Sequence, residues 1–311
     1  GRQAVCAGRR ACRKNITRGA MGAKIFGDYD RAGLDAQYDN RAKVPAFPEY
    51  LARFKSESAA ARDQYAGRMR LDVPVGPGPT ERADIFPAAG PGLAPVLVSI
   101  HGGYWLALDK EDFGFVAKGL VPHGITTVVI NYALIPSVRM AEVVRQCRQA
   151  TAWVLAGAAG FGGDPSRVAV AGHSAGGHLT AMVAATDWEG FTAPLVAIPV
   201  RSRPIGGVSL SGLHDLLPIS RCYLQESLHL TELEVERYSP MRLPPPRSGS
   251  WLALVGEKEG PEYHRQSTEL AERWTAAGAA DVRSRIAPGH DHFSIMMALA
   301  PTARALLMSP E

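Results

Sequence analysis

The residues best suited to chemistry lie in two short glycine-containing motifs. Residues 172–176 have the sequence Gly-His-Ser-Ala-Gly, and residues 101–105 have the sequence His-Gly-Gly-Tyr-Trp. The first matches a nucleophile elbow, in which a serine, here Ser174, lies on a sharp turn between a strand and a helix. The second can aim the N–H groups of Gly102 and Gly103 at a developing negative charge. Together the motifs predict attack by a serine on an acyl carbon next to an oxyanion hole.

The segments around Ser174 support this interpretation over a plain glycine- and serine-rich turn. Residues 167–171 are β-prone, whereas residues 177–185 are small and apolar enough for a helix packed closely on a sheet. The two glycines of the motif have a steric role, because a Cβ at either position would collide with the neighbouring strand or helix. We therefore expect a strand, a strained turn and a helix in that order.

A serine hydroxyl needs a histidine to accept its proton and a carboxylate to orient that histidine. On an α/β-hydrolase fold these groups follow the serine in the order acid, then histidine. Two histidines, His290 and His292, precede the last helix-like segment. We favour His292 as the base because the adjacent Phe293 can anchor the loop in the core.

The acid has several candidates, and position alone does not decide among them. The fold delivers the acid just after the strand that precedes the penultimate helix, here residues 251–255, so both Glu257 and Glu259 qualify. Asp215 follows an earlier strand and suits a turn or a cap. Asp291 adjoins the histidine too closely to reach its Nδ1. The full set of candidates is Glu257, Glu259, Glu262, Asp291 and Asp215.

The bulk properties allow a large core and exclude several function classes. The chain has 311 residues, of which 46% are hydrophobic, and no run reaches the roughly 18 apolar residues of a membrane span. Residues 1–20 hold six basic residues and no acid; without them the formal net charge of +4 becomes −2. The body of the chain therefore has no nucleic-acid-binding character. We expect residues 1–20 to be a disordered or non-native extension ahead of a start at Met21, with a targeting arm as the alternative.

Cysteine usage and histidine spacing indicate no cofactor and no metal. Cys6, Cys12, Cys147 and Cys222 form no Cys-x-x-Cys pair, and Cys147 lies in a helical pattern as a small core residue. No His-x-x-x-His pair lies near the elbow. We expect reduced thiols and a cytoplasmic enzyme.

Strand and helix patterns alternate from about residue 82 onward, which predicts an α/β fold with a mostly parallel central sheet and helices on both faces. The expected strands are 83–86, 95–100, 126–131, 167–171, 206–210, 251–255 and 282–286, and the expected helices are 111–120, 138–155, 175–185, 262–277 and 293–307.

Two regions interrupt this alternation. Residues 28–70 are polar with interspersed aromatic residues, and we expect an arm of short helices over the sheet or the pocket mouth. Residues 211–248 form an insertion between strands, which usually shapes the pocket. Residues 21–311 are expected to form a single domain.

Five segments resemble the kynurenine formamidase (arylformamidase) family, a branch of the α/β-hydrolases near the hormone-sensitive-lipase-like esterases. The resemblance extends from about residue 38 to the last helix, over most of the chain. It is carried by Tyr-Asp-Asn-Arg-Ala at 38–42, the motif at 101–105, Gly-His-Ser-Ala-Gly-Gly-His-Leu at 172–179, Gly-Glu-Lys-Glu-Gly-Pro-Glu-Tyr-His-Arg-Gln-Ser at 256–267, and Asp-His-Phe at 291–293.

The resemblance implies a catalytic set and a substrate class. It places the acid at Glu259, where animal members tend to have aspartate, and completes a triad with Ser174 and His292. The oxyanion donors would be the N–H groups of Gly102, Gly103 and Ala175. Tyr104 and Trp105 are candidates to wall the pocket for an aromatic substrate, with core packing as the alternative for Trp105. The implied reaction converts N-formylkynurenine to kynurenine and formate.

Two alternatives remain at this point. A carboxylesterase for short-chain or aryl esters would use the same residues. A non-catalytic ligand-binding homologue would usually lack a triad member, and here all three positions are filled. The expected partner is a small acyl substrate with an aromatic part. We expect the protein to bind neither nucleic acid nor a membrane. The sequence leaves the oligomeric state open, with a homodimer as one option.

Overall fold

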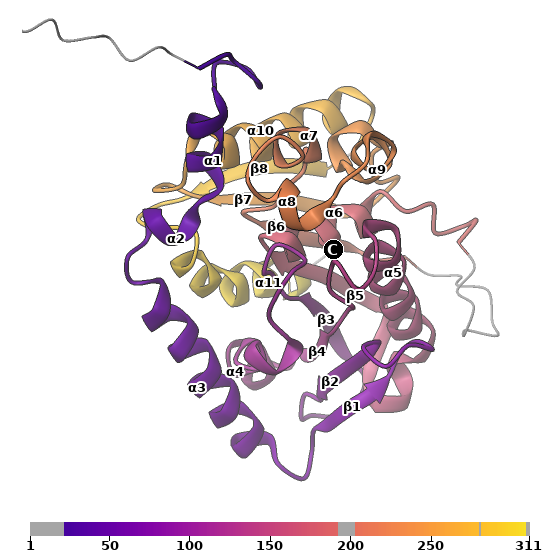
Figure 1. Ribbon diagram of the computed structural model, residues 1–311. Helices are drawn as coiled ribbons and strands as arrows, with labels where there is room; N and C mark the ends of the chain where they lie inside the picture. Colours follow the sequence, from indigo (N-terminus) through magenta and orange to yellow (C-terminus); the bar gives the residue numbers. More distant parts are fainter. Residues whose placement is uncertain (1–21, 192–202, 280, 309–311) are drawn as a thin grey trace, which may run out of the picture.

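The computed structural model describes residues 22–191, 203–279 and 281–308 (Figure 1). The expectations for residues 1–20 and for Cys6 and Cys12 therefore lie outside the described residues. Among those that are described, no helix is both long and apolar enough to traverse a bilayer.

An eight-stranded sheet forms the centre of the molecule, in the order β1-β2-β4-β3-β5-β6-β7-β8. The strands from β4 to β8 in this order pair in parallel, whereas β2 is antiparallel to both β1 and β4. This confirms the mostly parallel α/β fold. The strands are β1 (Arg70–Pro74), β2 (Arg82–Phe86), β3 (Ala94–Ile100), β4 (Thr126–Ile130), β5 (Gly163–His173), β6 (Gly206–Leu210), β7 (Ser250–Gly256) and β8 (Asp281–Ala287).

Helices cover both faces of the sheet, and further helices form most of the arm and of the insertion (Figure 1). The α-helices are α1 (Arg31–Tyr38), α2 (Asn40–Lys43), α3 (Phe47–Tyr65), α4 (Val116–Leu120), α5 (Met140–Gly157), α6 (Ala175–Ala184), α7 (Leu216–Ile219), α8 (Gln225–Leu228), α9 (Glu232–Tyr238), α10 (Pro261–Ala276) and α11 (Leu299–Met308). The 3-10 helices are η1 (Lys110–Asp112), η2 (Val121–His123), η3 (Ala158–Phe161), η4 (Pro240–Arg242) and η5 (Ser294–Ala298).

The core consists mainly of two layers, one on each face of the sheet. Along β3, Val96 and Val98 pack into the layer that includes residues of α5 and α6, whereas Leu97 packs into the layer under α4 and α11. Successive side chains of a strand point to opposite faces, and both faces are covered here. The central strands are therefore apolar at nearly every position, which is why they could be predicted from the sequence.

Three elements differ from the sequence-based expectation. Strand β1 was not expected, because its five residues, Arg-Leu-Asp-Val-Pro, include two charged ones and are mostly exposed, as suits an edge strand. The helix expected over 111–120 is instead η1 and the shorter α4. Gly114 lies between them, where the chain passes the ring of Phe86. The helix expected over 293–307 begins as the 3-10 helix η5 before α11.

A buried lysine fixes the segment that follows residues 101–105. The Lys110 ammonium lies 2.8 Å from Asp72 Oδ1 on β1 and 3.0 Å from Asp84 Oδ1 on β2. Asp84 is itself buried, so both charges need this pairing to offset their loss of hydration. The antiparallel strands β1 and β2 thus anchor the chain just beyond the glycine loop.

Candidate active site

Ser174 lies between the end of β5 and the start of α6, with φ 56° and ψ −116°. The backbone of a residue other than glycine is strained at this φ, and such strain persists only where the surrounding structure enforces it. They do so here: a Cβ at Gly172 would lie 2.3 Å from the Gly176 carbonyl oxygen, and one at Gly176 would lie 2.1 Å from that of Ile100. The turn is therefore as tight as the sequence predicted.

Ser174, His292 and Glu259 form one hydrogen-bonded chain. His292 Nε2 lies 3.2 Å from Ser174 Oγ, and His292 Nδ1 lies 2.7 Å from Glu259 Oε2. The carboxylate accepts from Nδ1–H, so the lone pair of Nε2 faces the serine hydroxyl. This is the arrangement in which an imidazole can accept the serine proton.

The Glu259 carboxylate is almost fully buried, with 1% of its side chain exposed. Its other oxygen, Oε1, accepts the backbone N–H of Gly256 at 2.7 Å and the hydroxyl of Ser211. These two donors leave Oε2 directed at His292. Sequence reasoning missed Ser211, and the available signal was its place immediately after the predicted strand 206–210.

His173, which precedes Ser174 in the motif at 172–176, is a second group whose contact was not predicted from the sequence. Its Nε2–H donates to the backbone carbonyl of His292 at 2.6 Å, which ties the end of β5 to the C-terminal loop. Burial, and then the neighbouring imidazole of His292, hold the pKa of His173 well below its usual range. The ring therefore stays neutral and acts as a fixed hydrogen-bond donor.

The loop at residues 101–105 approaches the elbow closely. A Cβ at Gly102 would lie 2.8 Å from the His173 carbonyl oxygen and 3.3 Å from Ser174 Cβ. Gly103 has φ +105°, which favours glycine. Within the described chain, the N–H groups of Gly102, Gly103 and Ala175 have no protein acceptor, as is required of donors that serve an oxyanion.

Tyr104 and Trp105 lie in different surroundings. Tyr104 lines the pocket, and its hydroxyl donates to the Tyr38 carbonyl at 2.7 Å and lies 2.8 Å from the Tyr263 hydroxyl. Trp105 is fully buried in the core, with its ring edge-on to His178 at 5.0 Å. It does not line the pocket, so the structure corresponds to the core-packing alternative for Trp105.

The side chain of His101 holds the glycine loop in place through hydrogen bonds and ring stacking. Its ring nitrogens each lie 2.9 Å from an oxygen, one from the Gly102 carbonyl and the other from Asn131 Oδ1. The ring stacks on Tyr132 at 4.2 Å, and the Tyr132 hydroxyl donates to the His101 carbonyl. These contacts fix the glycines without placing His101 in the pocket.

The cavity in front of Ser174 has a volume of about 380 Å³, within the range of small-molecule sites. Residues of the arm, from Asp39 to Phe54, and of the insertion, from Tyr223 to Ser227, contribute to its wall. Its lining consists of Asp39, Asn40, Arg41, Phe47, Leu51, Phe54, Gly102, Gly103, Tyr104, Leu106, Ala107, Leu108, Phe113, His173, Ser174, Tyr223, Leu224, Ser227, His292 and Phe293.

The remaining acid and base candidates have other partners. His290 contacts Ser294, and Glu257 is exposed and accepts the N–H of Gly289. Glu262 pairs with Arg265, Asp215 caps α7, and Asp291 accepts N–H groups at the start of η5. None of these five is hydrogen-bonded to His292 in the described structure.

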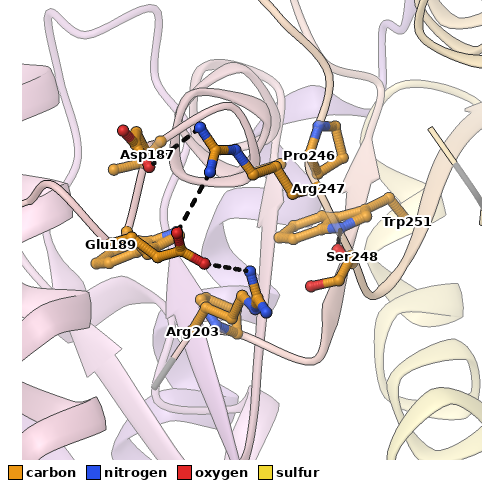
Figure 2. Close-up of a pocket in the computed structure, with 11 residues that line it drawn as sticks. Asp187, Glu189, Arg203, Pro246, Arg247, Ser248 and Trp251 are labelled. Carbon is orange, nitrogen blue, oxygen red and sulfur yellow. Dashed lines mark hydrogen bonds and ion pairs between the residues drawn. The ribbon is translucent and has the colours of Figure 1, made fainter. Parts of the chain in front are cut away.

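Charged side chains also gather around a hollow beside Trp251 (Figure 2). Arg247 lies 3.3 Å from Glu189 and 3.8 Å from Asp187, and Arg203 lies 3.5 Å from Glu189. The hollow has a volume of only about 20 Å³, room for about one water molecule. We interpret it as an exposed ion-pair cluster. Among the described residues, no group of three or more His, Cys, Asp or Glu side chains is arranged to hold a metal ion.

The sheet order, the strained serine at the end of β5 and the hydrogen-bonded chain behind it define the class of this protein, the α/β-hydrolases. Residues 84–199 match the BD-FAE family. Kynurenine formamidase of Salmo salar is 32% identical over 73% of this chain and 75% of its own length. That of Danio rerio is 31% identical over 79% and 82%. The chain belongs to the kynurenine formamidase family and is a hydrolase.

Other relatives are esterases. Esterase LipQ of Mycobacterium tuberculosis is 28% identical over 76% of this chain and 59% of its own length. Among solved structures, a Silicibacter sp. TM1040 protein assigned as a thioesterase has 29% identity and a TM-score of 0.75, covering 89% of this chain and 99% of its own. A Pyrobaculum calidifontis esterase has 18% identity and a TM-score of 0.65, covering 84% and 92%, and supports the fold alone.

Proposed function

We propose that this protein is an arylformamidase-type serine hydrolase that converts N-formylkynurenine to kynurenine and formate. The observation that carries the proposal is the hydrogen-bonded chain Ser174–His292–Glu259, which opens into a largely apolar, aromatic-lined pocket in a member of the kynurenine formamidase family. We assign Ser174 as nucleophile, His292 as base and then acid, and Glu259 as the group that orients His292.

The first half of the reaction forms an acyl-enzyme. Ser174 Oγ bonds to the formyl carbon while its proton moves to His292 Nε2. The carbonyl oxygen becomes an oxyanion, which the N–H groups of Gly102, Gly103 and Ala175 stabilise. The C–N bond then breaks, and His292 returns the proton to the leaving arylamine.

The second half regenerates the enzyme. Water takes the place of the amine, and His292 accepts one of its protons as the oxygen bonds to the formyl carbon. The bond to Ser174 Oγ then breaks as His292 returns its proton to that oxygen, and the formic acid released ionises in water to formate. No step requires a metal or a cofactor, and we propose that none is used. A cytoplasmic location and a homodimer are further proposals on which this chemistry does not depend.

The acyl side of the site is proposed to be small. The glycine loop lies against Ser174, since a Cβ at Gly102 would come within 3.3 Å of Ser174 Cβ, and Tyr104 stands on the adjoining wall. Trp105 supports this wall from the core and is not proposed to contact substrate. The leaving group would occupy the larger space lined by Phe47, Phe54 and Phe113.

A carboxylesterase that uses the same residues is the second candidate, favoured by the relationship to Esterase LipQ. A side-by-side comparison separates the two. We expect kcat/KM for formyl and acetyl substrates, including N-formylkynurenine, to exceed that for p-nitrophenyl octanoate by more than about tenfold, equivalent to about 1.4 kcal/mol in transition-state binding. An optimum at six or more acyl carbons, without turnover of N-formylkynurenine, would leave only the esterase.

A further inference from the structure

The charges on the pocket wall are few and lie together on the arm. Among the residues that line the described cavity, Asp39 supplies the only carboxylate and Arg41 the only guanidinium, and no lysine lines it. The other lining groups are apolar, aromatic or neutral polar. A pocket with this composition suits a ligand with an apolar body and both a negative and a positive charge at one end.

The arm that carries these two residues is fixed to the active site. Asn40, which lies between them, is buried, and its amide donates to the hydroxyl of Tyr104 at 2.9 Å and to that of Tyr263 at 2.7 Å. Tyr104 belongs to the glycine loop, and the ring of Tyr263 lies 4.8 Å from that of His292. The positions of Asp39 and Arg41 relative to Ser174 are therefore set by packing.

Both charged groups are held in place and still available to a ligand. Asp39 Oδ1 caps α2 by accepting the N–H of Ala42 at 3.0 Å. The Arg41 guanidinium lies over the Phe47 ring, 4.9 Å from its centroid. In the described part of the chain neither side chain forms an ion pair within 4.0 Å, although the charge of Lys43 acts on Asp39 from further away.

We infer that Arg41 and Asp39 recognise the α-amino-acid end of the leaving group, with Arg41 binding its carboxylate and Asp39 its ammonium. This inference rests on the proposed formamidase function and assigns the residues that recognise the amino-acid part of its substrate. A guanidinium can bind a carboxylate through two parallel hydrogen bonds, and these charge-assisted bonds are the strong ones. Simple aryl esters lack both charges and gain nothing from either residue.

Three substrates and four variants test the assignment. The substrates share one aryl formamide: N-formylkynurenine, its analogue without the amino group, and N-(2-acetylphenyl)formamide, which lacks both charges. The variants are Arg41→Gln, Arg41→Lys, Asp39→Asn and the control Arg68→Gln. Arg68 also lies over an aromatic ring, that of Tyr65 at 5.5 Å, but does not line the pocket.

We expect Arg41→Gln to lower kcat/KM for both carboxylates by about 10- to 100-fold more than for the neutral formamide, mainly through KM, which corresponds to one or two charge-assisted bonds. Asp39→Asn should lower kcat/KM for N-formylkynurenine alone, because it is the only one of the three substrates with an ammonium group. Arg41→Lys should restore part of the loss because it retains the charge. Arg68→Gln should not discriminate among the three substrates.

Equal losses on all three substrates would overturn the inference, because they would show a structural role for the arm. A wild-type enzyme with equal kcat/KM for the neutral formamide and for N-formylkynurenine would also overturn the inference. That result would not contradict the proposed function. A wild-type enzyme that hydrolyses none of the three formamides would instead refute the proposed function.

Discussion

At the scale of single residues, the site depends on how the Glu259 carboxylate is held. Its Oε1 is occupied by Gly256 N–H and the Ser211 hydroxyl, and its Oε2 by His292. An ionised carboxylate accepts all of these bonds, whereas a glutamine amide would present an NH₂ group to at least one donor. In the proposed mechanism the charge would also stabilise the imidazolium that forms when Ser174 gives its proton to His292.

We predict that Glu259→Gln lowers kcat by about 10²- to 10⁴-fold, since a misoriented histidine cannot serve as the base. Glu257→Gln is the matched control, because Glu257 qualified equally by sequence position and its carboxylate accepts the exposed Gly289 N–H rather than contacting His292. Steady-state kinetics of both variants decide the matter. An inactive Glu257→Gln beside an active Glu259→Gln would reverse the assignment.

The proposed site residues that could be predicted from the sequence are those that belong to a local motif. Ser174 and the two glycines of the loop belong to such motifs, and His292 belongs to the expected terminal loop. The supporting contacts of Ser211 and His173 were missed because they join segments 48 and 119 positions apart. No local pattern specifies pairs of this kind.

At the scale of elements, the buried stretches of the parallel strands could be predicted well, whereas strand β1 could not. The strands from β3 to β7 contain largely apolar, buried runs because both faces of the sheet are covered. Strand β1 has no such run: most of its side chains are exposed, Asp72 binds Lys110, and Val73 alone packs against the core. Burial thus makes a strand easier to recognise in the sequence, although strand β8 was expected at 282–286 despite its mostly exposed or half-buried side chains.

For the arm, too, only part of the structure could be predicted from the sequence. Its aromatic residues indicated packing over the sheet or the pocket mouth, and α1 and α2 lie beside α10 while α3 continues toward α4 (Figure 1). The bonds that fix the arm, such as Asn40 to Tyr263, span 223 positions. The general location could be inferred from composition, but the residues presented to the substrate could not.

At the scale of the whole molecule, buried neutral histidines couple stability to pH. Burial lowers the pKa of His178 to about 4 and that of His214 to about 3. His214 Nδ1–H donates to the Gln266 carbonyl at 3.2 Å, and its Nε2 lies 2.8 Å from the Ser209 hydroxyl. A second proton on either ring would place a charge in the core.

The unfolded chain protonates these histidines near pH 6.5, whereas the folded protein does not until pH 3–4. Between these values the unfolded state binds more protons, so stability is complete above about pH 6.5 and decreases as the pH falls. Each histidine should contribute about 1.4 kcal/mol per pH unit across this window.

We predict that the free energy of unfolding, measured in urea between pH 7.5 and 5, falls less steeply for His214→Gln than for the wild type, by about 1.4 kcal/mol per pH unit below pH 6.5. His123→Gln should retain the wild-type slope, because this side chain stays exposed in the folded protein. The slope is the decisive quantity, since a packing defect alone would shift the curve uniformly. Parallel curves for all three proteins would contradict the prediction.

The most direct test of the account is the rate of N-formylkynurenine hydrolysis by Ser174→Ala compared with the wild type. The variant removes the hydroxyl oxygen that faces His292 Nε2 at 3.2 Å, and circular dichroism should confirm that it is folded. We predict that kcat falls by about 10⁴- to 10⁶-fold. Retention of activity within about tenfold of the wild type would show that the bond is cleaved by other means and would contradict the account.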